Sequence, residues 1–400
     1  MYPKLSDLIN DIFGSDILLP IQSYGAMIAI AFLLAAFLLF LELKRKQKQG
    51  LVPVLKTTIT KGLPATPWEI FTSGILAFLL AWKGVAAITN YHRFATETQD
   101  FILSWHGNWW AGLLAGAASA TYTWYSKKKA KLDKPVKTEM DVPMSSISGN
   151  ILVITIIFGL IGAKLFDVIE HLDQFFADPL GTFFSFSGLT FYGGLIGGST
   201  AAIVYAYHKK IPIPVLIDAA APAMMIAYAV GRLGCHISGD GCWGIPNDTP
   251  KPEWLTWLPD WMWAYDYPHN VINEGVPIAN CSGTHCHVLP VPVFPTSLYE
   301  FSICTLFSLG LWFSRKFVKI NGLLFGIYLI LNGIERYSIE GIRTNIKYDI
   351  AGAYFTQARI IAICLILGGI ALGTWVVLKY RKQYRCCRQS LRKDVTGKTH

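Results

Sequence analysis

Charged side chains are scarce in this sequence. Only 15% of its 400 residues are Asp, Glu, Lys or Arg, whereas soluble globular domains carry about 25%. This shortage excludes an ordinary soluble domain, and the hydrophobic share of 52% favours a polytopic membrane protein. Acidic residues are the scarcer sign, yet the basic residues gather in short runs between apolar segments. We therefore attribute the net charge of +9 to membrane topology and expect no nucleic-acid partner.

Other features are absent as well. The sequence has no heptad pattern and no low-complexity tract, which excludes a long coiled coil. No basic region precedes the first apolar run, and the apolar core of that run is too long for a cleaved signal peptide. We therefore expect this run to be a retained helix.

The apolar runs are long enough to cross a bilayer, which takes about 20 residues in a helix. They predict an all-α polytopic integral membrane protein with about nine transmembrane helices. The segments are Ser23–Leu43, Ile70–Asn90, Asn108–Tyr125, Gly149–Ile169, Phe191–Tyr207, Pro214–Gly234, Thr296–Ser314, Gly322–Ile342 and Ile360–Tyr380.

The connections between these segments alternate in charge. Several are rich in Lys and Arg, whereas residues 235–295 are nearly free of both and rich in Trp. Because basic connections stay in the cytoplasm, we predict that the N-terminus and the 235–295 loop lie outside and the C-terminus inside. We expect residues 1–383 to form a single transmembrane domain, followed by a disordered cytoplasmic tail at 384–400.

An internal repeat relates residues 70–130 to residues 149–210. One fixed offset without a gap pairs Lys83 with Lys164, and it also pairs Ser104 with Ser185 and Gly112 with Gly193. Each copy is expected to be a transmembrane hairpin, unless the similarity is a chance likeness of apolar helices. Only the second copy keeps the Gly-Gly-Leu-Ile-Gly-Gly run, so we expect any chemistry to sit with that copy and the first copy to be scaffold.

Several polar residues fall inside or beside the apolar segments. An arginine deep in an apolar segment is costly without a counter-charge, so Arg232 and Arg336 indicate a functional site. Arg336 and Glu340 are four apart on one helical face and are predicted to pair. The alternative is that such residues form buried ion pairs that only lock helices together, or snorkel to the interface as lysines do. The residues are Tyr24, Lys83, Lys164, Asp218, Arg232, Asp240, Glu300, Glu335, Arg336, Glu340 and Arg343.

Two arginines facing lipid suit a phosphate ligand. A guanidinium group donates two parallel hydrogen bonds to phosphate and stays charged at any working pH. A phospholipid head group is the nearest such anion. Gly193 and Gly194 would let the backbone approach a head group, although small residues equally permit tight helix packing.

These motifs together resemble the bacterial prolipoprotein diacylglyceryl transferase family. The resemblance covers residues 24–43 and most of 149–380, with five motifs in the family's order. The motifs are Tyr24-Gly25, the Gly193–Gly198 run, Asp218 with Pro222 and Gly231-Arg232-x-Gly234 before Trp243-Gly244, Pro295-x-x-Leu298-Tyr299-Glu300, and Arg336-Tyr337-x-x-Glu340-x-x-Arg343.

The resemblance implies a transferase of the bacterial cytoplasmic membrane with its site toward the outer leaflet. The family moves the diacylglyceryl group of phosphatidylglycerol onto the lipobox cysteine in the signal peptide of a preprolipoprotein. Arg232 and Arg336 match the family's two essential arginines, and no cofactor or metal is expected. The further positions carried over to head-group binding or catalysis are Tyr24, Tyr192, Gly193, Gly194, Ser238, Asp240, Tyr299, Glu300, Glu340 and Arg343.

The sequence departs from the family pattern near these arginines. Tyr192 and Phe294 replace histidines, so a histidine general base is in doubt. The proton acceptor is left open among Tyr192, Asp240 and His236. The other departures are Cys235 and Ser238 for asparagines, Asp240 for a glutamate, and one extra residue before Trp243-Gly244.

Two further questions stay open at this stage. Cys281 and Cys286 are expected either to form a small disulfide loop or, with His285 and His287, to imitate a metal site. Broken helices and intramembrane arginines also occur in channels and transporters, and the departures are compatible with an inactive phospholipid-binding relative.

Overall fold

A computed structural model describes residues 1–61, 63–133, 136–184, 190–281, 283–344, 347–350 and 353–396. The chain divides into two compact units. The larger consists of Met1, Tyr24–Val54 and Pro143–His400, and the smaller of Tyr2–Ser23 and Leu55–Val142. That residues 1–383 form a single transmembrane domain stays a prediction.

The smaller unit is built on a helical hairpin and a two-stranded antiparallel ribbon. Its long helix α3 begins with a capping box, because Thr66 accepts a hydrogen bond from the backbone of Glu69 and the Glu69 side chain bonds back to Thr66. Its elements are α1 (Leu5–Phe13), β1 (Lys56–Lys61), α3 (Pro67–Thr89), α4 (Tyr91–Thr96), α5 (Thr98–Leu103), α6 (Trp109–Lys129) and β2 (Val136–Asp141).

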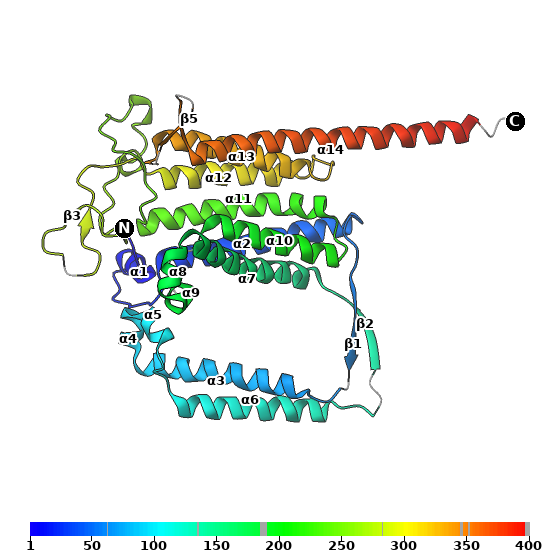
Figure 1. Cartoon of the computed structure of the whole chain (residues 1–400), viewed down its shortest axis with the longest axis horizontal. Coiled ribbons are helices and arrows are strands. Elements are labelled where there is room, and N and C mark those ends of the chain that lie inside the picture. Colours follow the sequence, from blue (N-terminus) through cyan, green and yellow to red (C-terminus); the bar gives the residue numbers. More distant parts are fainter. Residues whose placement is uncertain are drawn as a thin grey trace. The chain divides into compact units, whose positions relative to one another are not determined.

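The larger unit is a helical bundle in which α11, α12, α13 and α14 lie in adjacent layers (Figure 1). Its helices are α2 (Ser23–Lys48), α7 (Met144–Glu170), α8 (Leu172–Ala177), α9 (Pro179–Phe184), α10 (Phe191–His208), α11 (Ile213–Ser238), α12 (Thr296–Ser314), α13 (Leu323–Ile339) and α14 (Gln357–Thr396). Its short elements are η1 (Glu253–Leu255), η2 (Asp260–Met262), β3 (Val276–Pro277), β4 (His287–Val288), η3 (Glu340–Ile342), β5 (Lys347–Ile350) and β6 (Ala353–Thr356).

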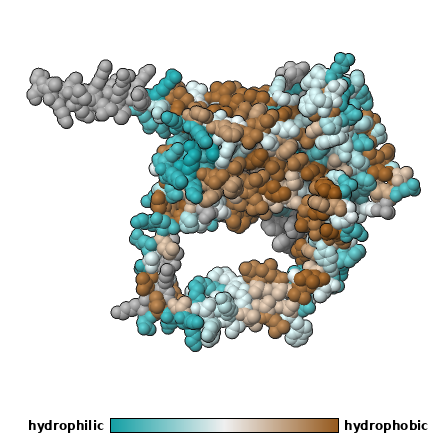
Figure 2. All heavy atoms as spheres, turned by 180° about the vertical axis from the view of Figure 1, so that it is seen from behind, coloured by the Kyte–Doolittle hydropathy of each residue, from teal (hydrophilic) through white to brown (hydrophobic). Residues whose placement is uncertain are grey.

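Each of the nine predicted apolar segments coincides with a long helix of the structure. Among the described residues, five helices are long and apolar enough to cross a membrane: Ser23–Lys48, Pro67–Thr89, Ser146–Glu170, Ile213–Ser238 and Gln357–Gln383. Figure 2 shows hydrophobic side chains across the outward faces of helices in the larger unit, with hydrophilic residues toward the helix ends. The protein is thus an all-α membrane protein, while the number of crossings stays a prediction.

The helix α14 extends further than expected. It continues to Thr396, so most of the predicted irregular tail is helical, and residues 397–400 lie outside the described residues.

The two repeat copies fold into hairpins with the same order of elements. The short helices α4 and α5 of the first copy match α8 and α9 of the second at the offset that pairs Lys83 with Lys164. Both lysines have structural partners: Lys83 Nζ donates to backbone carbonyls, including that of Phe101 at 2.9 Å, and Lys164 Nζ lies 3.0 Å from Asp167 Oδ2. Ser185 lies outside the described residues.

The glycine run of the second copy packs α10 against α7. A Cβ atom on Gly193 would run into the carbonyl oxygen of Gly162, and one on Gly197 would run into the carbonyl oxygen of Phe158. Gly194 lies beside the carbonyl oxygen of Gly159. These contacts support the helix-packing alternative, because the small residues let two helix backbones touch.

The centre of the bundle is an apolar cluster between α11, α12 and α13, which includes Met225, Cys304 and Tyr328. Asp218, predicted as a functional-motif residue, has a structural role in this core. Its buried carboxylate accepts the backbone N–H of Gly322 at 2.7 Å and that of Phe325 at 2.9 Å, so α11 caps the start of α13.

A buried carboxylate also ties α2 to the end of α12. Glu42 is 0% exposed, and its Oε2 lies 2.7 Å from Arg315 Nη1. Arg45 donates to both oxygens of Glu42, at 2.9 and 2.5 Å. Removing one partner of a buried ion cluster leaves the others uncompensated.

We therefore expect Glu42→Ala to lower the free energy of unfolding by about 3 kcal/mol, measured by thermal unfolding in detergent micelles. Glu139→Ala is the control, because the Glu139–Lys56 pair is exposed and should leave the melting temperature unchanged. Equal shifts for both variants would contradict the assignment.

Candidate functional site

Arg232, the arginine in the apolar run of α11, meets a buried counter-charge as predicted. Its Nε atom lies 2.8 Å from Oε2 of Glu300 on α12. The two groups form an ion pair, but the N–H direction does not meet the geometry of a hydrogen bond. The guanidinium also lies over the Tyr228 ring, 5.0 Å from its centroid. Gly234, two residues further, lets α11 approach Met27 of α2. Arg232 is therefore fixed by groups from two helices.

Glu300 brings two more arginines to the same place. Its Oε1 atom lies 3.5 Å from Arg336 Nη1 and 3.2 Å from Arg343 Nη1. The predicted pair of Arg336 and Glu340 is confirmed, with 3.6 Å between Nη2 and Oε2. Three guanidinium groups from two separate stretches of the sequence thus contact one carboxylate.

The two signs of charge in this arginine cluster (Arg232, Arg336, Arg343) differ in burial. The side chains of the three arginines keep 17%, 24% and 13% of their surface exposed, whereas those of Glu300 and Glu340 keep 0%. Within this cluster, the exposed surface therefore belongs to the arginine side chains and not to Glu300 or Glu340. The charges are held apart from water by protein, which strengthens their interaction with an incoming anion.

A further buried carboxylate lies on α13 beside this cluster. Glu335 is 2% exposed, and neither of its carboxylate oxygens has a hydrogen-bond partner among the described residues. It interacts electrostatically with Glu300 and the three arginines. Sequence reasoning listed Glu335 but assigned it no role.

A second group of side chains adjoins Arg232 at the end of α11. Ligand atoms of Cys235, Asp240 and Cys242 all lie within 4.8 Å of one another. Tyr24 of α2 is close enough to interact electrostatically with all three and with Arg232. The hydrogen bond with Cys235 lowers the pKa of the Cys242 thiol. We call Cys235, Asp240 and Cys242 the Cys-Asp-Cys group.

Two glycines shape the turn that brings this group together. Gly239 has φ +66° and Gly241 has φ +86°, backbone conformations that other residues rarely adopt. The turn is then tied to α12, because Thr296 Oγ1 donates to the Cys242 carbonyl at 2.9 Å. The Cys-Asp-Cys group is therefore held by backbone geometry on both sides.

The Trp-rich segment 235–295 docks on the helix ends through aromatic residues. His236 is 7% exposed and bonds through Nδ1 to the Tyr267 hydroxyl at 3.1 Å, so it serves in packing. Burial raises the pKa of Tyr267, which packs with Trp243. Tyr299 donates its hydroxyl to the Met262 carbonyl at 2.8 Å and so links α12 to this loop.

Other predicted site residues have different surroundings. Ser238 is 1% exposed and donates to the Gly234 carbonyl at 2.9 Å, which is a structural role. Tyr192 is 42% exposed in the first turn of α10. Gly193 and Gly194 face α7, as described above. Contact of any of these residues with a substrate stays a prediction.

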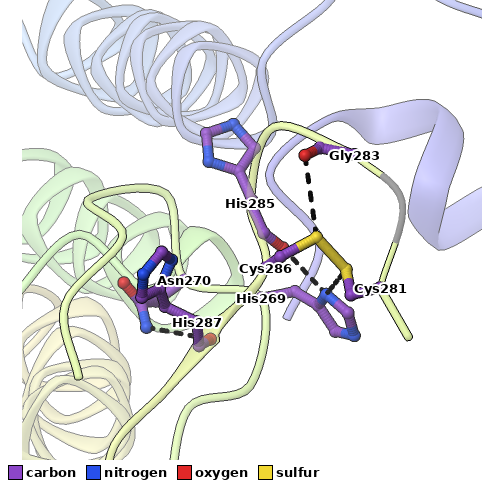
Figure 3. Close-up of a disulfide and its surroundings, with 7 residues drawn as sticks. All are labelled: His269, Asn270, Cys281, Gly283, His285, Cys286 and His287. Carbon is purple, nitrogen blue, oxygen red and sulfur yellow. Dashed lines mark hydrogen bonds between the residues drawn. A yellow bond between two sulfur atoms is a disulfide. The ribbon is translucent and has the colours of Figure 1, made fainter. Parts of the chain in front are cut away.

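The open question about Cys281 and Cys286 is resolved in favour of a disulfide (Figure 3). His269 lies beside it, with its Nδ1 atom 2.9 Å from the His285 carbonyl oxygen. Asn270 holds the chain next to this disulfide, since its amide donates to the His287 carbonyl at 3.3 Å. The disulfide closes a small loop within segment 235–295, and these cysteines do not form a metal site.

Two features of the site escaped sequence reasoning. Cys242 was not singled out, although its spacing to Cys235 and Asp240 places three ligand-type residues in eight positions. Glu300 was expected to bind substrate, whereas it is buried and gathers the arginines. The spacing of Cys235, Asp240 and Cys242 was a usable signal for Cys242. No local pattern shows that Glu300, among several carboxylates, lies at the centre of the arginine cluster.

Comparison with known proteins identifies the family to which the chain is similar. Residues 102–375 match the family model described as prolipoprotein diacylglyceryl transferase. The chain is similar to proteins from three bacteria, each named phosphatidylglycerol–prolipoprotein diacylglyceryl transferase. The one from Leptospira interrogans is 31% identical over 49% of this chain, and the chain spans only 61% of its length.

The other two relatives are covered more fully. The protein from Shewanella sp. strain ANA-3 is 31% identical, with 54% of this chain and 69% of the relative aligned. The protein from Vibrio vulnificus strain CMCP6 is 27% identical, with 66% and 86% aligned. The family model also covers more than half of the chain, including every arginine of the cluster. The chain is a multi-pass membrane protein that belongs to the prolipoprotein diacylglyceryl transferase family.

Proposed function

We propose that this protein transfers the diacylglyceryl group of phosphatidylglycerol to the lipobox cysteine of a preprolipoprotein signal peptide. The product is a thioether, and glycerol phosphate is released. Family membership supports the reaction class, and the names of the relatives supply the two substrates. This reaction would be the first step of lipoprotein maturation.

The observation that carries the proposal is the burial asymmetry of the arginine cluster. The side chains of Arg232, Arg336 and Arg343 are partly exposed, while the carboxylate that holds them is fully buried. A phosphodiester head group therefore meets positively charged hydrogen-bond donors that are already in position. Guanidinium groups suit phosphate oxygens because they donate in a fork that matches two oxygens at once.

The chemistry follows from that placement. The lipobox sulfur attacks the glyceryl carbon that carries the phosphate, a carbon–sulfur bond forms, and the carbon–oxygen bond to the phosphate breaks. The electron pair leaves with the phosphate oxygen, so negative charge develops on the leaving group. Arginines already in position stabilise that charge without reorganisation, which lowers the barrier. The thiol proton must also leave, and Tyr192 and Asp240 stay candidate acceptors.

Glu300 acts as a positioning residue in this scheme. It contacts each arginine of the cluster but has no exposed surface with which to touch a lipid. Each guanidinium is thereby held in one orientation before the head group arrives. Such preorganisation contributes more to the rate than to ground-state binding.

We further propose a topology of about nine spans with the N-terminus and the 235–295 loop outside, and the arginine cluster toward the outer leaflet of the bacterial cytoplasmic membrane. The basic runs after α2, α6 and α10 support this orientation, because Lys and Arg favour the cytoplasmic side. Exposed Trp254 and Trp257 suit a membrane–water interface.

Arg232→Ala and Arg336→Ala should each lower the rate of transfer by about 100-fold or more, because charge on the leaving phosphate loses a fixed donor. The measurement is mass spectrometry of a lipobox peptide incubated with purified protein and phosphatidylglycerol. Lys83→Ala is the control and should keep most activity, since Lys83 bonds to backbone carbonyls of the smaller unit. An equal loss of activity in Lys83→Ala and in the arginine variants would contradict the assignment of Lys83 to scaffold. No product from the unaltered protein would indicate an inactive relative.

Glu300→Gln should lower kcat by about tenfold or more without raising KM for phosphatidylglycerol, because the arginines keep their charge but lose their alignment. Glu42→Gln is the matched control, since Glu42 is also buried and bridges arginines, but at the opposite end of α2 from Tyr24. A raised KM with unchanged kcat would instead mean that Glu300 contributes only to binding.

The topology is tested by cysteine labelling in spheroplasts. Trp257→Cys should react with a membrane-impermeant maleimide in intact spheroplasts, because Trp257 is 76% exposed in the external loop. Lys129→Cys, at the end of α6, should react only after lysis. The reverse pattern would invert the orientation, and the unaltered protein gives the background of native thiols.

A further inference from the structure

The Cys-Asp-Cys group lies beside the arginine cluster, and the scheme above uses only its Asp240, as a candidate proton acceptor. Its two sulfur atoms and one carboxylate oxygen lie within 4.8 Å of one another. Both cysteines carry free thiols, and Cys235 is buried at the end of α11. Two of its members, Cys235 and Asp240, are departures from the family pattern, and the third follows within the stretch that has one extra residue.

The donor set fits one kind of ligand. Two thiolates and a carboxylate are ligands that zinc accepts, and three protein ligands with one open position are typical of catalytic zinc sites. Tetrahedral zinc places such ligand atoms about 3.5 to 3.8 Å apart. The ligand atoms are at most 4.8 Å apart in the structure. They must therefore move closer together by about an ångström at most to bind zinc.

The backbone around the group favours such a site. The Cys242 backbone N–H donates to Asp240 Oδ1 at 3.1 Å, which orients the carboxylate and leaves its second oxygen for a ligand bond. The left-handed glycines on either side of Asp240 fold the chain back toward Cys235. Thr296 holds the Cys242 carbonyl from α12.

The charge balance also favours a cation here. Two thiolates, one carboxylate and one divalent ion carry a net charge of −1. Arg232 interacts electrostatically with both cysteines and supplies a compensating positive charge. A structural dithiol would need neither the carboxylate nor the guanidinium.

We propose that Cys235, Asp240 and Cys242 bind a zinc ion whose open position takes the lipobox thiol as thiolate. The second half of this proposal rests on the proposed function. The substrate thiol loses its proton to water on binding zinc, because a metal-coordinated thiol is deprotonated. Its sulfur then supplies the electron pair for the carbon–sulfur bond, while the carbon–oxygen bond breaks toward Arg232 and Arg336.

This arrangement accounts for the missing histidines. Where Tyr192 and Phe294 replace the family's histidines, no histidine is needed to take the thiol proton. Asp240 is then a metal ligand and not a proton acceptor. The thioether product is a weaker ligand than a thiolate because it is uncharged, so it leaves the site.

The first test is the metal content of the full chain, purified in detergent without chelators and measured by inductively coupled plasma mass spectrometry. About one zinc per chain is expected, falling to below about one tenth in Cys242→Ser and Asp240→Asn. Cys364→Ser is the matched control, because Cys364 is a free, exposed cysteine of α14 and should leave the metal content unchanged. Zinc retained in Cys242→Ser would overturn the site.

A second measurement does not depend on variants that fold poorly. Apo-protein of the unaltered chain reconstituted with Co²⁺ should show thiolate-to-cobalt absorption in the near ultraviolet and the visible bands of a tetrahedral site. Absence of both would overturn the proposal. So would a Cys235–Cys242 disulfide, found by peptide mass spectrometry of protein alkylated without reductant.

The role of the open position has its own test. Addition of a lipobox peptide should shift the cobalt spectrum, whereas the same peptide with serine in place of cysteine should not. No shift with the cysteine peptide would overturn the thiolate role.

Failure of this inference and failure of the proposed function give different results. Transfer at full rate by Cys242→Ser, or by protein stripped of metal, would overturn the zinc site and leave the transferase standing. Bound zinc and a thiol-dependent spectral shift, without any transfer to the lipobox peptide, would uphold the site and overturn the transferase. Loss of transfer on stripping, with recovery on adding zinc, would support both.

Discussion

The structure of the site depends on one buried negative charge. Glu300 sits at 0% exposure, where a carboxylate is costly unless cations surround it. Arg232 from α11, Arg336 from α13 and Arg343 beyond η3 satisfy that requirement together. Each arginine is equally costly alone in an apolar environment. These ion pairs connect one end each of α11, α12 and α13. The exposed surface of the cluster belongs to the arginine side chains and not to Glu300.

The departures from the family pattern gain meaning from their position. Cys235, Asp240 and Cys242 look like unrelated changes along the chain, but the two left-handed glycines bring them within 4.8 Å. Both cysteines lie close enough to Arg232 to interact with it electrostatically. Changes of this kind are easier to understand as one altered group than as separate losses.

Much of the fold could be predicted because hydrophobic length is a strong signal. All nine apolar segments are helices, and the need of Arg232 for a counter-charge and the Arg336–Glu340 pairing followed from simple electrostatics. The identity of the counter-charge did not follow, since Glu300 is distant in sequence and only packing selects it. The capping role of Asp218 and the helical tail to Thr396 depend on tertiary contacts and chain continuity, which residue patterns do not encode.

Two neighbouring residues at the start of α12 link distant parts of the larger unit. Tyr299 bonds to the Met262 carbonyl of the Trp-rich segment, and the adjacent Glu300 holds the arginines. A displacement of that segment therefore pulls on the same helical turn that orients the guanidinium groups. A single turn of helix therefore couples the position of the Trp-rich segment mechanically to the orientation of the arginine cluster.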